Sequence, residues 1–261
     1  MSESNKRNFI VHGSILAIAG ILVRIIGMLY RIPVVNIIGS EGNGIYGAAF
    51  NIYNIMLVLS SYGLPMAVSK LVSARFTKRR YKSAAKVLRC SLMVAVCTGG
   101  IAALLVFFGA SFIENVIYGG GLPGLAIPLR ILAPTIFLVA ILGVIRGFFQ
   151  GQSTMIPTAV SQILEQIVNA IVSIAAGYGM MKAFASSPDV AAYGAAGSTL
   201  GTAMGALTAV LFMGFLYAVY TPTFNRLKRK DRHTENQSTG QICKIIIYTM
   251  IPIILGQTFY Q

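Results

Sequence analysis

The chain has 261 residues, of which 56% are hydrophobic and only 11% are charged, and its formal net charge is +14. Soluble domains carry about 25% charged residues, so this composition, with a mean hydropathy of +0.73, excludes an ordinary soluble domain. The apolar residues come in blocks of about 20, the length that crosses a hydrocarbon core roughly 30 Å thick. We therefore predict an all-α integral membrane protein. We interpret the first block as a retained span and not as a cleaved signal peptide.

The apolar blocks are separated by glycine-rich, proline-containing or charged segments. A turn is predicted at IGSEGNG (residues 38–44) and a break at YGGGLPG (residues 118–124), and SSPDV (residues 186–190) closes the fifth block. About seven transmembrane helices are predicted, at residues 9–38, 44–72, 84–109, 126–149, 157–181, 193–219 and 242–260.

The positive charge is concentrated in two stretches that flank apolar blocks. This distribution is typical of cytoplasmic loops that rest against anionic membrane lipids, and it argues against a nucleic-acid partner. With a cytoplasmic N-terminus, every strongly basic loop falls on one side of the membrane, so we predict that orientation. The basic residues are Arg75, Lys78, Arg79, Arg80, Lys82, Lys86 and Arg89 in the first stretch, and Arg226, Lys228, Arg229, Lys230 and Arg232 in the second.

The sequence has no recognisable arrangement of catalytic or metal-binding residues. Cys90, Cys97 and Cys243 form neither a metal-ligand spacing nor a disulfide framework. His12 and His233 do not belong to a nucleophile, metal-ligand or phosphate-loop motif. We therefore predict that the protein is not an enzyme and has no cofactor and no metal site.

The sixth predicted span has glycines at four-residue spacing, at Gly197, Gly201 and Gly205. Residues four apart lie on the same face of a helix, and small side chains there allow a neighbouring helix to approach closely. We interpret this strip as a helix-packing surface.

Arg24 and Arg31 are the strongest candidates for binding residues, because both lie inside the first apolar block. Residues seven apart on an α-helix differ by about 20° in direction, so the two side chains share a face. Gly20 and Gly27 lie close to that face and leave room beside it. An arginine at mid-membrane costs about 2.5 to 3.5 kcal/mol on insertion scales, which favours a water-filled cavity. The alternative is that a long side chain reaches the headgroups, most plausibly that of Arg31.

A second polar stripe runs along the fifth predicted span. Glu165 is the only acidic residue inside any predicted span. The stripe either faces a polar cavity or forms a hydrogen-bonded seam between helices, and both interpretations remain open. Its members recur at steps of three and four, which is one face of a helix; they are Thr158, Gln162, Glu165, Gln166, Asn169 and Ser173.

Further polar residues lie in other spans. Asn51 and Asn54 share one side of the second span, and the fourth contains Arg130, Arg146 and Gln150. Helices that each offer one polar face predict a polar cavity inside the bundle. Guanidinium groups form forked hydrogen bonds with phosphate oxygens, so the predicted ligand carries a phosphate or pyrophosphate, and the amide side chains suit sugar hydroxyls.

Several stretches resemble polysaccharide exporters of the stage V sporulation protein B-like branch, within the multidrug/oligosaccharidyl-lipid/polysaccharide (MOP) flippase superfamily that includes the lipid II flippases. The resemblance covers essentially the whole chain and implies movement of undecaprenyl-linked saccharides across the bacterial plasma membrane, through a two-lobed bundle with a central cationic cavity. The stretches are VRIIGMLYRIP followed by IIGSEGNGIYG, then SSYGLPMAVSKLVS, then RGFFQGQSTMIPTAVSQILEQIVN.

The resemblance also distinguishes the two arginines of the first span. Arg24 fits the first cavity arginine of the lipid II flippases, in its R-x-x-G setting. Tyr30 stands where that branch has its second arginine, so Arg31 points about 100° away from the position that the resemblance implies.

The chain is predicted to hold the N-terminal lobe and the start of a second. We expect a six-helix lobe at residues 1–220, a basic cytoplasmic loop at 221–241 and a seventh helix at 242–261. Such a chain is either a truncated product or fragment, or it pairs with a second lobe or another copy.

The functional hypothesis is a flippase for lipid-linked saccharides that works by alternating access. Arg24, Arg31 and Arg130 are predicted to hold the pyrophosphate. Conformational change would draw on the membrane potential or an ion gradient. The alternatives are a cation-coupled multidrug antiporter of the same superfamily, which would need cavity acids, and a non-transporting membrane scaffold or assembly partner. The residues predicted to balance charge or to contact sugar are Asn51, Asn54, Gln162, Glu165 and Asn169.

Overall fold

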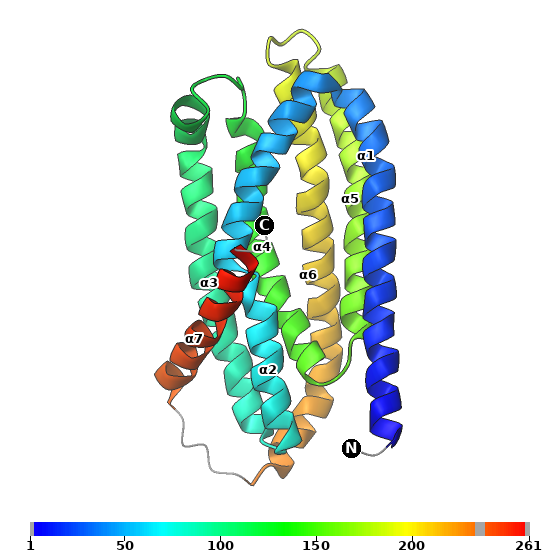
Figure 1. The fold of residues 1–261 in the computed structure, drawn as a ribbon, viewed down its shortest axis with the longest axis vertical. Coiled ribbons are helices and arrows are strands. Elements are labelled where there is room, and N and C mark those ends of the chain that lie inside the picture. Colours follow the sequence, from blue (N-terminus) through cyan, green and yellow to red (C-terminus); the bar gives the residue numbers. More distant parts are fainter. Residues whose placement is uncertain (1–2, 233–237, 259–261) are drawn as a thin grey trace.

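The protein is a bundle of long helices in a computed structural model that describes residues 3–232 and 238–258, with side chains at 14–232 and 238–256 (Figure 1). Within these described residues, six helical segments are long and apolar enough to cross a membrane, which confirms the all-α membrane fold. A short π-helical turn, η1, follows α3. The elements are α1 (Glu3–Ser60), α2 (Gly63–Thr77), α3 (Tyr81–Phe112), η1 (Ile113–Ile117), α4 (Ala126–Gly151), α5 (Ile156–Ala183), α6 (Val190–Lys230) and α7 (Thr239–Thr258).

Helix α1 reverses direction at Gly39. That residue has φ 72° and ψ −176°, a combination that glycine adopts without the steric penalty of a Cβ atom. In Figure 1 the first limb of α1, in dark blue, runs along one side of the bundle, and the second limb, in lighter blue, returns toward α2. The predicted turn is therefore confirmed, and α1 accounts for two predicted spans. The helix resumes immediately after Gly39, so the predicted loop is shorter than expected.

The end of α6 differs from the prediction. We expected a basic loop from residue 221, but the helix continues to Lys230. Phe224 is fully buried there and its ring stacks on Phe76 of α2, so packing holds this extension of the helix. The basic residues of its last turn also lie where the helix dipole favours positive charge; they are Lys228, Arg229 and Lys230.

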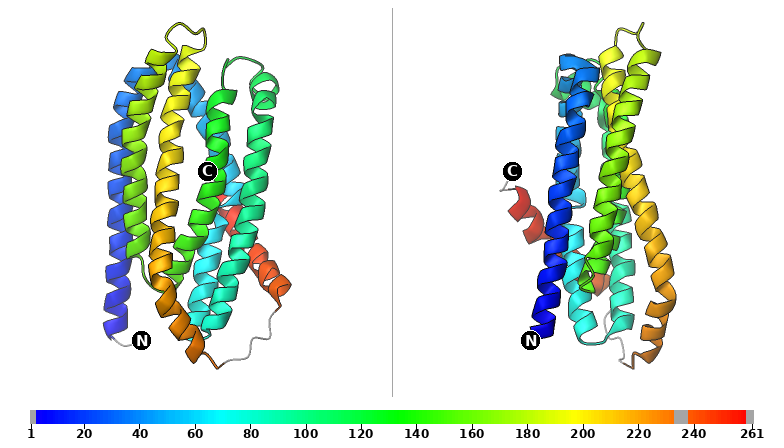
Figure 2. Two further views of the ribbon diagram at one scale, coloured as in Figure 1. Left: turned by 180° about the vertical axis from the view of Figure 1, so that it is seen from behind. Right: turned by 90° about the vertical axis from the view of Figure 1, so that its right-hand side faces the viewer.

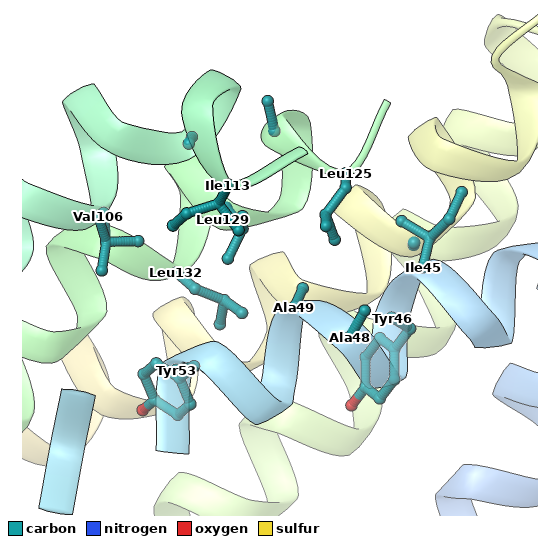
Figure 3. Close-up of a cluster of buried hydrophobic side chains, with 14 of the residues drawn as sticks. Ile45, Tyr46, Ala48, Ala49, Tyr53, Val106, Ile113, Leu125, Leu129 and Leu132 are labelled. Carbon is teal, nitrogen blue, oxygen red and sulfur yellow. The ribbon is translucent and has the colours of Figure 1, made fainter. Parts of the chain in front are cut away.

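Two apolar clusters hold the bundle together. One lies toward the Gly39 end, where Leu125 and Leu129 near the start of α4 pack with Ile45 of α1 (Figure 3). The other lies toward the opposite end, around Phe148 of α4 and Ile246 of α7. Inside a membrane these side chains exchange lipid contacts for close van der Waals packing, and this packing stabilises the bundle.

Large apolar side chains also cover the outside of the bundle. Phe108 is 76% exposed, Phe215 66% and Leu211 64%. A soluble protein would place such residues inside, whereas a membrane protein presents them to lipid. The exposed surface therefore agrees with the six membrane-spanning segments.

The predicted glycine strip of α6 packs directly against α5. A Cβ atom added at Gly197 or Gly205 would fall within 2.6 Å of a backbone carbonyl of α5, so only glycine permits this separation. Sequence reasoning missed a second strip of the same kind on α4, where glycines pack against α2. A Cβ atom added at Gly147 would lie 2.6 Å from the carbonyl oxygen of Pro65. The members of the second strip are Gly143, Gly147 and Gly151.

Replacing Gly201 by alanine is expected to destabilise the α5–α6 pair by about 1 to 3 kcal/mol. The new Cβ would lie 2.5 Å from the carbonyl oxygen of Asn169 and 2.6 Å from the amide nitrogen of Ser173, and backbone atoms cannot rotate away. Gly214→Ala is the matched control on the same helix, because nothing lies within 4 Å of its added Cβ. Thermal unfolding of both purified variants in detergent tests this, and equal midpoints would contradict the close packing.

Candidate functional site

The candidate site begins with Arg24 and Arg31, whose side chains are both exposed on the first limb of α1. Within the described ranges, neither guanidinium forms a hydrogen bond or an ion pair with another residue. At 1.5 Å per residue, Arg24 lies about 22 Å and Arg31 about 12 Å along the helix from the turn at Gly39. Arg24 is therefore deep within a span.

Both arginines border the face on which this limb packs against α5. Helix geometry places Gly27 about 60° from Arg24 and about 40° from Arg31. A Cβ atom at Gly27 would meet Nε2 of Gln166 at 3.1 Å, whereas one at Gly20 would meet nothing within 4 Å. The predicted free space therefore exists at Gly20, and Gly27 instead gives α5 a close approach beside the arginines.

Glu165 is paired with Arg146, not with the arginines of α1. Nη2 of Arg146 donates to Oε2 of Glu165 at 2.7 Å, and Nε donates to Oγ of Ser161 at 2.9 Å. The two charged side chains are 15% and 26% exposed, so the pair is largely shielded from solvent. The ion pair joins the end of α4 to the start of α5, and the charge of Glu165 is balanced there.

Asn169 belongs to a hydrogen-bonded seam that links three helical segments. Its Nδ2 donates to the hydroxyl oxygen of Tyr30 on α1 at 3.2 Å. Its Oδ1 accepts from Oγ of Ser173 at 2.9 Å and from Oγ1 of Thr202 on α6 at 3.5 Å. Asn169 is itself buried. Of the two interpretations of the α5 stripe, the seam between helices describes Asn169.

The structure distributes the remaining predicted residues over different surfaces. Asn51 and Asn54 are both exposed on the second limb of α1, and Gln162 is half-buried on α5. Nη2 of Arg130 donates to Oγ of Ser111 on α3 at 2.9 Å. Helix α3 and the first limb of α1 lie on opposite sides of the bundle (Figures 1 and 2), so Arg130 does not join Arg24 and Arg31 in one cluster.

Sequence reasoning missed the tyrosines beside α1 and the α5 stripe. Tyr30 accepts a hydrogen bond from Asn169 of the stripe. Tyr46, on the second limb of α1, lies near Tyr30 and Arg31, and Tyr53 lies near Glu165. In Figure 3 both Tyr46 and Tyr53 turn their hydroxyl oxygens away from Leu125, Leu129 and Leu132. The sequence did contain a signal for this pair: Tyr46 and Tyr53 are seven residues apart, which places both rings on one helix face.

This geometry suits the binding of an anion beside α1. Two guanidinium groups without an ion-pair partner among the described residues point to one side of a helix, while Glu165, the only acid inside the predicted spans, is occupied by Arg146. A phosphate or pyrophosphate would supply the missing negative charge through forked hydrogen bonds. Among the residues that the structure describes, no group of three or more His, Cys, Asp or Glu side chains could hold a metal ion.

Comparison with known proteins assigns the fold to a family. The family model described as "Polysaccharide biosynthesis protein" matches residues 10–259. The chain belongs to this family. One of the relatives described next is a flippase by name, which agrees with the prediction that the chain is not an enzyme.

Relatives of this family member include two proteins of Bacillus subtilis (strain 168). The lipid II flippase MurJ is 34% identical over 176 residues, which cover 65% of this chain and 32% of the flippase. Stage V sporulation protein B is 30% identical over 210 residues, which cover 80% of this chain and 39% of that protein. The chain therefore spans between about a third and two fifths of the length of these relatives.

Solved structures show the same fold in MOP superfamily transporters. A crystal structure of a MATE transporter in its straight conformation aligns with a TM-score of 0.75 at 17% sequence identity. The alignment covers 97% of this chain and 53% of the transporter. The helices of this chain thus have the arrangement of about half of a MOP-type bundle, as the resemblance implied.

Proposed function

We propose that this chain forms one lobe of a flippase that moves undecaprenyl-pyrophosphate-linked saccharides across the bacterial plasma membrane. The observation that carries the proposal is the exposed pair Arg24 and Arg31, deep in the apolar first limb of α1 and without an ion-pair partner in the described part of the chain. A lipid-linked pyrophosphate is an anion whose head group must pass this depth when the lipid moves from one leaflet to the other. The name of one Bacillus subtilis relative, the lipid II flippase, supports this substrate class.

The other predicted site residues divide into contact and support roles. Asn51, Asn54 and Gln162 keep amide groups at least partly accessible, and we assign them to sugar hydroxyls. Glu165 and Asn169 are engaged by Arg146 and by Tyr30, so we assign them to holding α5 against its neighbours. The pyrophosphate contact then rests on Arg24 and Arg31.

The orientation belongs to the same proposal. The N-terminal end of α1, the α2–α3 turn and the end of α6 lie at one end of the bundle (Figure 2). The turn holds Lys78, Arg79 and Arg80, and the last turn of α6 is also basic. Positively charged ends remain on the cytoplasmic side. The N-terminus is then cytoplasmic, and these segments lie against anionic lipids.

A cation-coupled multidrug antiporter is the rival within the superfamily, and its fold is shared by the MATE structures. Cationic drugs require free carboxylates in the cavity. Glu165, the only acid inside the predicted spans, already forms an ion pair at 2.7 Å. The balance of charge therefore favours an anionic substrate.

The experiment measures how much lipid-linked precursor becomes accessible in the outer leaflet of bacteria depleted of their own flippase. The chain is expressed alone, and in parallel with the second half of the Bacillus subtilis flippase. We expect accessibility to rise only when a second lobe is present, and to fall about tenfold with Arg24→Gln because one forked contact to phosphate is lost.

Two results would contradict this proposal in different ways. If the chain alone, as a monomer, restored the accessibility of the precursor in the outer leaflet, this result would contradict the need for a second lobe. No recovery in either arm, with both proteins present in the membrane, would contradict the flippase function and leave the scaffold alternative.

A further inference from the structure

A cationic cavity lies apart from the arginines of α1, where α3, α6 and α7 meet. Its volume is about 510 Å³. All four charged side chains that line it are positive. The lining residues are Lys82, Ala85, Lys86, Arg89, Cys90, Met93, Lys228 and Thr239.

The cations converge because of helix geometry. Lys82, Lys86 and Arg89 follow one another at steps of four and three, so they share one face of α3. Lys228 comes from the last turn of α6. Like charges at such spacing repel each other and destabilise a helix. A bound anion would remove this repulsion.

Hydrogen bonds between the three elements hold the walls in place. The backbone N–H of Lys82 donates to Oδ2 of Asp231 at 2.9 Å, and this carboxylate is buried at 5% exposure. The Sγ of Cys90 donates to the carbonyl oxygen of Thr239 at 3.8 Å. These bonds fasten the end of α6 and the first residue of α7 to α3, so the cavity is fixed on three sides.

The cavity continues into the lipid-facing surface of α3. From Lys82 to Arg89 the helix rises about 10 Å, comparable with the headgroup region of one leaflet. Met93 follows at 57% exposure, and Leu104 farther along the same face is also 57% exposed. A ligand with a charged head and apolar chains matches this order of cationic and apolar residues better than a small soluble anion does.

We propose that this cavity binds the phosphate group of an anionic lipid headgroup from the leaflet at this end of the bundle. The lipid chains would lie along the exposed face of α3. Because Thr239 begins α7, an occupied cavity ties α7 to α3 and α6. The proposal does not depend on flippase activity, since neither Arg24 nor Arg31 lines the cavity.

The test measures lipid binding by the purified full chain in a neutral detergent, by thermal stabilisation and by native mass spectrometry. The probes are short-chain phosphatidylglycerol, short-chain phosphatidylcholine and inorganic phosphate. The cavity variant is Lys82→Gln with Arg89→Gln. The control, Arg226→Gln with Lys230→Gln, removes the same charges from exposed positions of α6 outside the lining.

We expect phosphatidylglycerol to bind the wild-type chain and the control, and to bind the cavity variant at least about tenfold more weakly. Binding should also weaken as salt rises. Equal losses in the two double variants, or equal binding of phosphatidylcholine, would overturn the site. Binding of inorganic phosphate without binding of the lipid would overturn the lipid assignment. If the cavity variant does not fold, phosphatidylglycerol binding is compared between the single variants Arg89→Gln and Arg226→Gln, and equal losses would again overturn the site.

Discussion

Replacing Glu165 by glutamine is expected to lower the free energy of unfolding by about 2 to 3 kcal/mol. Removing one partner of a buried ion pair costs about 3 to 5 kcal/mol, because the other charge is left without compensation. The Arg146–Glu165 pair is 15% and 26% exposed, and partial access to solvent reduces this cost. The amide oxygen of the glutamine and Oγ of Ser161 can still accept from Arg146, but neither group balances a full charge.

Unfolding of the purified protein in detergent, followed by temperature or by added denaturing detergent, measures this effect. Glu41→Gln is the matched control, because Glu41 is an exposed acid near the Gly39 turn. A double-mutant cycle with Arg146→Gln isolates the pair. We expect the double variant to be more stable than the sum of the two single losses predicts. Strictly additive losses would mean that the ion pair does not stabilise the α4–α5 junction.

Much of the fold could be predicted from local patterns. Span length, the Gly39 turn and the glycine strip at Gly197, Gly201 and Gly205 each follow from residues close together in the sequence. The second strip, at Gly143, Gly147 and Gly151, had the same four-residue signal and was overlooked. The extension of α6 to Lys230 was not predictable from hydropathy, because the tertiary packing of Phe224 stabilises it.

The partners of the polar residues were harder to predict. A polar stripe shows that a helix face is polar, but not whether it meets water or another helix. Asn169 meets Tyr30, Ser173 and Thr202, and these contacts depend on the register between α1, α5 and α6. The pairing of Arg146 with Ser161 did leave a signal. The two residues are nearly equidistant from the short α4–α5 turn, and antiparallel helices bring such positions together.

Replacing Arg24 is expected to have the largest effect on substrate binding. Its guanidinium lies about 22 Å along the helix from the Gly39 turn and has no hydrogen-bond or ion-pair partner among the described residues. In the proposed site, a forked contact with pyrophosphate would compensate the cost of placing that charge in the membrane. Arg24→Gln removes the fork and the charge, so we expect the affinity for lipid-linked pyrophosphate to fall about tenfold or more. Arg31→Gln should cost less, because Arg31 lies nearer the Gly39 turn.

Direct binding of undecaprenyl pyrophosphate to the purified chain in nanodiscs tests the role of α1 most directly. The wild type is compared with Arg24→Gln and with Arg226→Gln, which removes one exposed arginine from α6, at a constant fraction of anionic lipid. We expect the wild type and Arg226→Gln to bind equally, and Arg24→Gln to bind about tenfold more weakly. Undiminished binding by a folded Arg24→Gln protein would contradict a pyrophosphate site on α1.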